Sequence, residues 1–142
     1  MKVRDAMTTE VEVATPVDTI QQVARRMSEL DTGVMPVCDG QRVQGIITDR
    51  DITIRVVAEG GDINSPVSQY MTEDVEYAYE SDDLEKVAKR MGDLQIRRMI
   101  VVTENKDLAG IISLGDLARE GKAKVIGNVL EDISEPGDQP AR

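Results

Sequence analysis

Two short runs of the sequence each place a hydroxyl side chain three residues before a carboxylate, at the end of an apolar stretch. They read GIITDRD, with Thr48 and Asp51, and GIISLGD, with Ser113 and Asp116. Such a pair forms a capping box when a helix begins between its members, because the hydroxyl accepts from a helix amide and the acid reaches back. The same pair could instead accept hydrogen bonds from the hydroxyls of a sugar, since a carboxylate has two acceptor oxygens. The residues alone leave both interpretations open.

A carboxylate repels phosphate, so a sugar phosphate would need guanidinium groups or helix amides for its charged end. The candidate phosphate-binding residues are Arg97 and Arg98, with Arg50 and Arg55 near the first acid. The alternative is that these arginines are solvated surface charges of an acidic protein. On one strand Arg97 and Arg98 point to opposite faces, so at most one of them enters a site unless a turn precedes the strand.

Two of the three tyrosines, Tyr77 and Tyr79, lie two residues apart and therefore share one face of a predicted strand. On that face they could cover the base of a nucleoside. A half-buried strand position is the commoner use of tyrosine, so packing is the alternative interpretation.

The charge balance and composition of the 142-residue chain exclude several classes of function. Lys and Arg number 17 against 27 Asp and Glu, and the net charge of −10 argues against nucleic acid as a partner. The absence of histidine removes the usual general base and zinc ligand, and we expect no metal site. The one cysteine, Cys38, fits a reducing compartment and a buried small side chain. No run approaches ~18 apolar residues, so we expect a cytoplasmic protein without a membrane partner.

The chain also contains an internal repeat. Residues 7–38 and 71–102 are identical at thirteen of 32 positions at a fixed offset of 64, and a one-residue insertion then shifts the offset to 65. A duplicated unit of this kind predicts two copies of one supersecondary plan.

Within each copy the hydrophobic period changes from strand to helix and back. Strands are expected at 11–13, 34–38 and 43–47, and again at 75–77, 99–102 and 108–112. Helices are expected at 20–30 and 84–94, and closing helices from Thr48 and Ser113 onward. The resulting βαββα order predicts an α+β fold in which helices pack on a small sheet.

The predicted organisation has a first repeat at 1–60, a linker at 61–68, a second repeat at 69–122 and a C-terminal extension at 123–142. A unit of about 60 residues is marginally stable alone, so the two copies are expected to pack together. The extension is expected to be partly disordered, from Glu131 to Arg142, because it is polar and contains two prolines.

These motifs, in this order and repeated, resemble a tandem pair of CBS (cystathionine β-synthase) domains over about residues 1–120. The resemblance rests on Met7-Thr8 and Met71-Thr72, on Met35-Pro36-Val37, and on GIITDRD and GIISLGD. It implies pseudo-twofold symmetry, two clefts between the copies, and an adenosine-containing ligand such as AMP, ADP, ATP or S-adenosylmethionine. It also implies a homodimer, since family members commonly form flat discs.

The resemblance assigns roles to residues of this sequence. The ribose-contacting pairs of the family correspond to Thr48 with Asp51 and to Ser113 with Asp116. Its phosphate-contacting basic positions correspond to Arg97 and Arg98. The segments that border the base correspond to Thr15-Pro16 and Tyr79-Glu80, so the candidate base-bordering residues, with Tyr77, are Thr15, Pro16, Tyr77 and Tyr79.

The function predicted from the sequence is therefore a regulatory sensor rather than an enzyme, because no nucleophile, base or metal set is visible. It would require no cofactor, would bind an adenine nucleotide as a regulatory ligand, and would pass its state to an effector protein whose identity the sequence does not give. The alternative is a structural dimerisation module with no physiological nucleotide.

Overall fold

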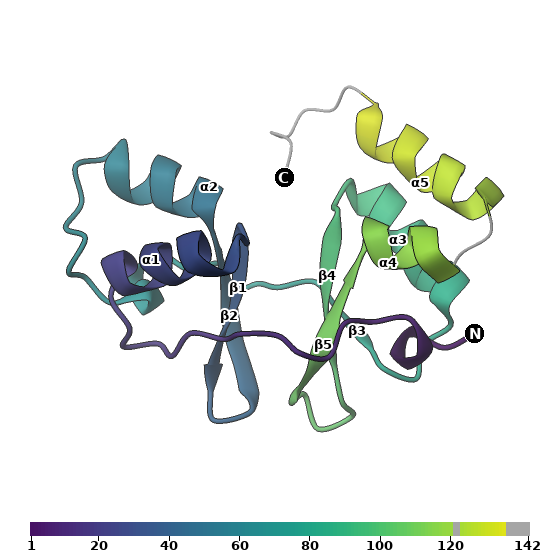
Figure 1. Cartoon of the computed structure of the whole chain (residues 1–142), viewed down its shortest axis with the longest axis horizontal. Helices are drawn as coiled ribbons and strands as arrows, with labels where there is room; N and C mark the ends of the chain where they lie inside the picture. The colour runs from purple at the N-terminus through teal and green to yellow at the C-terminus, as the bar shows by residue number, and fades with distance from the viewer. Residues whose placement is uncertain (121–122, 136–142) are drawn as a thin grey trace. The chain divides into compact units, whose positions relative to one another are not determined.

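The computed structural model describes residues 1–120 and 123–135, with the backbone alone for 123–126 (Figure 1). The chain forms two compact units. The first unit is Val11–Val75, and the second unit combines Met1–Glu10 with the chain from Glu76 onward. The fold is mixed α+β, as the sequence predicts.

The first unit contains one hairpin and its covering helices (Figure 1). Its elements are α1 Ile20–Leu30, β1 Val34–Asp39, β2 Arg42–Thr48, α2 Asp49–Asp51, the π-helical continuation η2 Ile52–Val57, and the short 3-10 turn η3 Val67–Gln69. Thr19 caps α1 through a capping box with Gln22, and Asp31, in the left-handed region, ends it. The antiparallel hairpin turns at Gly40, whose φ of +61° favours glycine.

The strand predicted at 11–13 does not form, and this prediction is wrong. A single parallel bridge joins Ala14 to Val37 instead. Backbone groups on either side of Ala14 are bonded to side chains rather than to a neighbouring strand. The Arg26 guanidinium donates to the Val13 carbonyl at 2.8 Å, and the Thr15 amide donates to the Asp18 carboxylate at 2.9 Å. The second unit has the equivalent bonds, from Arg90 to the Tyr77 carbonyl and from the Tyr79 amide to Asp82, and still forms a strand there. The difference lies in the partner strand, where Pro36 replaces Ile100 and has no N–H for a ladder hydrogen bond.

The second unit has a three-stranded sheet of order β3-β4-β5. Its elements are η1 Val3–Asp5, β3 Tyr77–Tyr79, α3 Leu84–Leu94, β4 Arg98–Val102, β5 Leu108–Ser113, α4 Leu114–Glu120 and α5 Ala123–Ser134. β3 runs parallel to β4, and β4 runs antiparallel to β5. The leading strand predicted at 75–77 is thus present here but begins at Tyr77.

In each unit a short segment of chain, called the strap below, pairs with a strand beside a glycine. The strap contains Thr72 in the first unit and Thr8 in the second. Thr72 bridges to Ile46 in the first unit, and Thr8 bridges to Ile111 in the second. A Cβ on Gly45 would lie 2.6 Å from the Thr72 carbonyl oxygen, and one on Gly110 would overlap the Thr8 carbonyl in the same way. These glycines are needed because the backbones approach too closely for a side chain.

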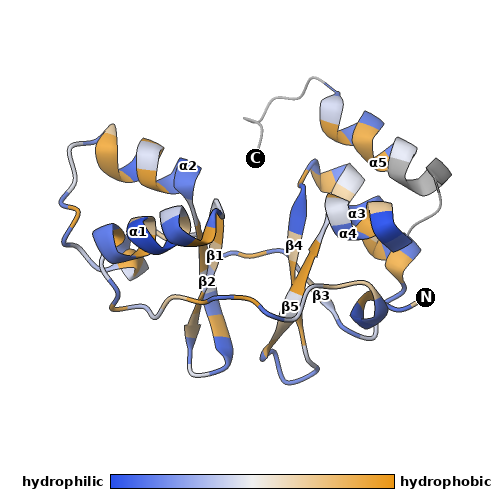
Figure 2. Cartoon of the chain, viewed as in Figure 1, coloured by the Kyte–Doolittle hydropathy of each residue, from blue (hydrophilic) through white to orange (hydrophobic). Residues whose placement is uncertain are grey.

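Each unit has its own apolar core, and the apolar stripes of its helices point inward (Figure 2). In the first unit Val23 and Met27 of α1 pack with Met35 and Ile47 of the hairpin. Cys38 is buried, as predicted, and burial raises the pKa of its thiol. Among the described residues, no helix is both long and apolar enough to span a bilayer.

Part of the C-terminal extension forms a helix. α5 continues to Ser134, and its Val129 is only 2% exposed in the core of the second unit. Within this helix the Gln95 side chain donates to the Asp132 carbonyl at 2.9 Å. The partial disorder expected from Glu131 to Arg142 stays a prediction. Residues 136–142 lie outside the described residues.

Candidate functional site

In the first unit the hydroxyl and acid singled out from the sequence lie at the junction between β2 and α2. Thr48 is the N-cap of α2, and its Oγ1 accepts from the Asp51 amide at 3.0 Å. Asp51 Oδ2 accepts in return from the Thr48 amide at 3.0 Å. The pair therefore forms the capping box that the sequence analysis gave as one interpretation.

The second oxygen of Asp51 accepts no hydrogen bond from the described residues. Its nearest cation is the Arg55 guanidinium, with Nη2 at 3.6 Å from Oδ1, and the Asp51 side chain is 16% exposed. Arg55 also donates to the Tyr70 carbonyl at 2.8 Å, so its guanidinium links the Asp51 carboxylate to the backbone at Tyr70. Asp51 thus keeps one acceptor oxygen available for a further donor.

In the second unit the equivalent pair forms the same cap between β5 and α4. Asp116 Oδ2 accepts from the Ser113 amide at 3.0 Å and from the Ser113 hydroxyl at 3.1 Å, and Ser113 Oγ accepts from the Asp116 amide at 3.2 Å. The residues that build the two caps are therefore equivalent, as the repeat predicts.

The remaining oxygen of Asp116 is occupied, unlike that of Asp51. Thr8 Oγ1, from the strap, donates to Oδ1 at 3.1 Å, and the Arg119 guanidinium forms a short ion pair with the same oxygen. The Asp116 side chain is only 2% exposed. Both of its oxygens are thus bonded within the second unit.

Thr8 and Arg119 are site residues that the sequence analysis missed. Arg119 lies one turn after Asp116, so its i,i+3 spacing was a readable signal. Thr8 lies 108 residues away and had no local signal, although it belongs to the repeated Met7-Thr8 motif.

The four candidate phosphate-binding arginines are exposed. Arg98 is the first residue of β4 and pairs in register with Ser113, and the Arg97 carbonyl accepts from the Leu114 amide at 3.1 Å. Arg97 precedes the strand, so the opposite-face restriction does not apply to the two residues. The guanidinium groups of Arg97, Arg98 and Arg50 form no ion pair with any described residue. Both Arg97 and Arg98 thus lie beside the second cap.

The candidate base-bordering residues lie in matching turns of the two units. The Thr15 amide donates to the Asp18 carboxylate, and the Tyr79 amide donates to the Asp82 carboxylate, each at 2.9 Å. These amides are consequently bonded within the fold, and the carbonyl of Pro16 accepts from the Ser68 amide at 3.2 Å.

The two tyrosines of β3 share a face, as the sequence predicts. Both are half-buried, and the rings of Tyr77 and Tyr79 lie 6.0 Å apart in a T-shaped arrangement. Such an edge-to-face pair stabilises both rings. Tyr77 and Tyr79 therefore pack on each other on one side of the strand.

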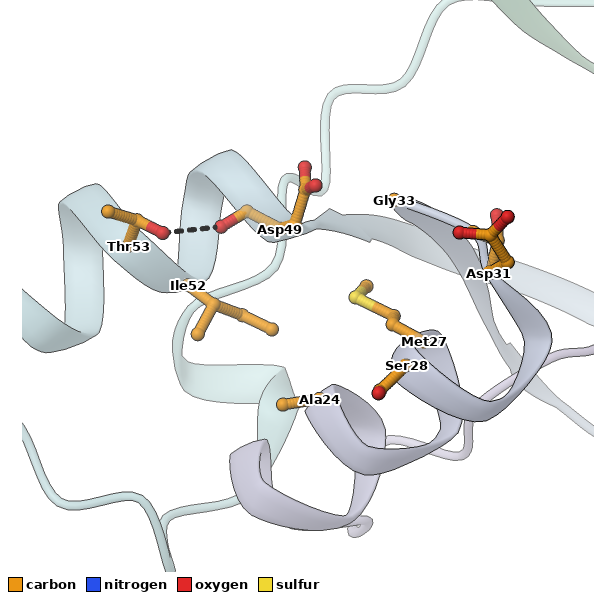
Figure 3. Close-up of a pocket in the computed structure, with 9 residues that line it drawn as sticks. Ala24, Met27, Ser28, Asp31, Gly33, Asp49, Ile52 and Thr53 are labelled. Atoms are coloured by element: carbon orange, nitrogen blue, oxygen red, sulfur yellow. Dashed lines mark hydrogen bonds between the residues drawn. The ribbon is translucent and has the colours of Figure 1, made fainter.

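Two hollows in the structure lie away from these residues. One, of about 410 Å³, lies in the first unit between α1 and the helical segment from Asp49 to Thr53 (Figure 3). The other, of about 620 Å³, lies in the second unit between α3 and α5. Neither is lined by the candidate ribose, phosphate or base residues.

The fold and the repeated cap define a class: a tandem α+β repeat protein with a hydroxyl and an acid at each strand-to-helix junction. The model of the CBS domain family matches residues 3–58 and 67–123, and this chain belongs to that family. CBS domain proteins are generally regulatory modules, and the matching model indicates no catalytic family.

A curated relative matches almost the whole chain. The CBS domain-containing protein YhcV of Bacillus subtilis is 38% identical over 133 residues, which are 93% of this chain and 94% of YhcV.

Solved structures share the fold. Hypoxic response protein I, solved with two coordinated zinc ions, gives a TM-score of 0.77 at 31% identity over 84% of this chain and 98% of its own. The Pyrobaculum aerophilum CBS domain protein PAE2072, solved with AMP, gives 0.77 at 20% identity over 92% and 99%. The CBS domain pair of MJ0100, solved with 5′-methylthioadenosine and S-adenosylmethionine, gives 0.73 at 24% identity over 84% and 94%.

Proposed function

We propose that this chain is a regulatory module that binds an adenosine-containing ligand, and that the cap of its first unit contacts the ribose. The observation that carries the proposal is the available oxygen of Asp51. Oδ1 accepts no hydrogen bond from the described residues and lies beside an exposed helix start. A ribose hydroxyl is a suitable donor for it, because hydrogen bonds to an ionised acceptor are the stronger kind.

The same proposal gives roles to the other candidates. Thr48 would orient Asp51 through the cap, and Arg50 would meet phosphate, with Arg55 bracing the acid. In the second unit Arg97 and Arg98 would meet phosphate beside Ser113. Thr15 and Pro16, and Tyr77 and Tyr79 in the other unit, would border a base.

Two comparisons support adenosine as the common part of the ligand. A CBS domain protein has been solved with AMP and a CBS domain pair with S-adenosylmethionine and 5′-methylthioadenosine, and all three molecules contain an adenosine unit. AMP, ADP, ATP and S-adenosylmethionine are therefore the ligands to test, with no other cofactor required. We also propose a homodimer, an effector protein as partner, and a cytoplasmic location.

Calorimetry with AMP, ATP and S-adenosylmethionine tests the proposal directly. Asp51→Asn is the informative variant, because its amide oxygen can still accept from the Thr48 amide while an NH₂ group replaces Oδ1. We expect AMP affinity to fall about tenfold or more, since a hydrogen bond to a charged group contributes roughly 1.5–3 kcal/mol. Absence of heat from all three ligands with the unmodified chain contradicts the proposal.

A second candidate function is a structural dimerisation module without a nucleotide. The observation that favours it is Asp116, whose two oxygens are both used to hold the second unit together. On this hypothesis none of the ligands raises the melting temperature, whereas a ligand that binds only the folded state must raise it. Mass spectrometry of nucleotides that co-purify with the chain separates the two functions without assuming a ligand.

A further inference from the structure

We propose that Arg119 closes the cap of the second unit to a ribose, so that the unmodified chain binds one adenosine-containing ligand rather than two. The two caps are built from equivalent residues, and Arg119 is the side chain that decides which cap has an available acceptor. This inference rests on the proposed function, since it concerns the same class of ligand at the second cap.

Arg119 lies on the solvent side of the acid with which it pairs. α4 begins directly after β5 (Figure 1), and the i,i+3 spacing places Arg119 one turn beyond Asp116. The Arg119 side chain is 66% exposed, whereas the Asp116 side chain is 2% exposed. The guanidinium therefore covers the Oδ1 atom of Asp116.

Arg119 also uses the acceptor position that a ribose hydroxyl would need. A carboxylate offers about four acceptor positions, two on each oxygen. Asp116 Oδ2 accepts from the amide and the hydroxyl of Ser113, and Oδ1 accepts from the Thr8 hydroxyl and pairs with Arg119. A ribose hydroxyl can therefore bond to Asp116 only by displacing one of these donors. Arg119 is difficult to displace with a neutral hydroxyl, because an ion pair with both partners charged is the stronger hydrogen bond.

The other candidate groups of the second cap need no rearrangement. Arg97 and Arg98 are exposed and form no ion pair with any described residue. Both lie beside the cap, since Arg98 pairs in register with Ser113 and the Arg97 carbonyl accepts from the Leu114 amide. Their guanidinium groups are thus available to phosphate. What the second cap lacks is an available acceptor for the sugar.

The first unit shows the same cap without this contact. At the repeat offset of 65, Ile54 stands where the second unit has Arg119. Its side chain is 49% exposed and has no hydrogen-bond donor. Asp51 Oδ1 accepts no hydrogen bond from the described residues, so it stays available to a ribose.

Arg55 does not take over the role of Arg119 in the first unit. Its Nη2 lies 3.6 Å from Asp51 Oδ1, which is longer than a normal hydrogen bond, while its Nη1 donates to the Tyr70 carbonyl at 2.8 Å. The counterpart of Arg55 in the second unit is Glu120, which carries the opposite charge. The two units thus place an arginine at different positions of the turn after the cap, and only the position of Arg119 fills the acceptor.

The alternative is that Arg119 only stabilises the second unit. The exposure of its side chain argues against a large contribution, because ion pairs with a solvent-exposed partner contribute little to stability. Without Arg119, Asp116 still accepts from Thr8 and Ser113. The main consequence of the ion pair is therefore the closed acceptor rather than the stability of the fold.

The experiment counts the AMP molecules bound by the full chain, by native mass spectrometry and by calorimetry. Arg119→Ile installs the residue of the first unit at the equivalent position. We expect one AMP per unmodified chain and two per chain of Arg119→Ile, with the additional AMP lost again when Asp116→Asn is combined with Arg119→Ile. The matched control is Lys89→Ile, which removes a cation from an exposed position of α3 and should still bind one AMP.

The inference and the proposed function fail in different ways. If Arg119→Ile is folded by circular dichroism and binds no more AMP than the unmodified chain, the role of Arg119 is overturned, as it is by two AMP molecules on the unmodified chain. Absence of AMP from the unmodified chain contradicts the proposed function. In that case AMP on Arg119→Ile that is lost with Asp116→Asn still supports the closed acceptor, and no AMP on Arg119→Ile overturns it.

Arg119→Ala provides the same measurement if isoleucine at this position lowers the stability too far, because alanine favours the helix. It also removes the donor and keeps the bonds of Thr8 and Ser113 to Asp116. If neither variant folds, the ion pair is required for the second unit, and the inference is overturned.

Discussion

The two units have the same cap and use it differently. In the first, one oxygen of Asp51 is bonded to the cap, and the other lies near Arg55 and accepts no hydrogen bond from the described residues. In the second, both oxygens of Asp116 are bonded within the unit. The difference comes from two side chains outside the cap: Thr8 on the strap and Arg119 on α4. Duplication therefore preserved the helix start, while neighbouring residues decide whether the acid is available to a ligand.

The largest expected difference between the units is in stability. Asp116→Ala leaves the Ser113 amide and the Thr8 hydroxyl without their acceptor, and we expect a loss of about 3 kcal/mol in the free energy of unfolding. Asp51→Ala removes the capping-box acid and should cost only about 1 kcal/mol. Urea denaturation of both variants measures the comparison, and equal losses would contradict the distinction between an available and a fully bonded acid.

The second prediction concerns ligand affinity. If Asp51 is the acid that meets the ribose, Asp51→Asn weakens AMP binding about tenfold, which corresponds to ~1.4 kcal/mol. Asp116→Asn, the matched control, should lower stability and leave AMP affinity within about twofold. Calorimetry well below the melting temperature of each variant keeps the two effects separate. The reverse pattern would assign the ribose to the second unit.

The third prediction concerns α5, which among the described residues has no counterpart in the first unit. Gln95→Ala removes a hydrogen bond to Asp132 of α5 and one to Glu135, the residue after α5, and should destabilise the chain by about 1–2 kcal/mol. Asp31→Ala is the matched control, because Asp31 occupies the same left-handed position and its side chain has no hydrogen bond to a helix in the described part of the chain. Its cost should be at least about 1 kcal/mol smaller, since net hydrogen bonds contribute roughly 0.5–1.5 kcal/mol each. Equal losses in the free energy of unfolding, measured with denaturant, would show that the hydrogen bonds of Gln95 do not stabilise α5.

Much of the fold could be predicted from the sequence because its signals are local. The spacing of Val23 and Met27 predicts α1, and the apolar runs around Gly40 predict the hairpin β1–β2. The leading strand of the first copy was predicted wrongly, because the alternation of Val11 and Val13 does not show that the partner strand carries Pro36, which has no N–H to donate, where the second copy has Ile100. Likewise, α5 is stabilised through Gln95, 37 residues from Asp132.

The candidate site also combines a local feature that the sequence predicts with a long-range contact that it does not. The spacing of Ser113 and Asp116 predicts their cap, which is a contact over three residues. The repeat suggests that the two acids are equivalent, yet the environment of Asp116 depends on Thr8, 108 residues away. A local pattern can place an acid at a helix start, but long-range contacts decide which of its oxygens stays available.

The smallest prediction tests that long-range contact alone. Thr8→Ala removes the hydrogen bond to Asp116 Oδ1 and should cost about 1 kcal/mol, because Arg119 still pairs with the same oxygen. Thr72 is the repeat counterpart of Thr8 and makes no side-chain hydrogen bond to Asp51, so Thr72→Ala should change stability by less than about 0.5 kcal/mol. Denaturant unfolding of the two variants provides the measurement. If Thr72→Ala costs as much as Thr8→Ala, the hydrogen bond between the Thr8 hydroxyl and Asp116 adds no stability of its own. The acceptor oxygen Oδ1 of Asp116 would then be held by other contacts than the Thr8 hydroxyl.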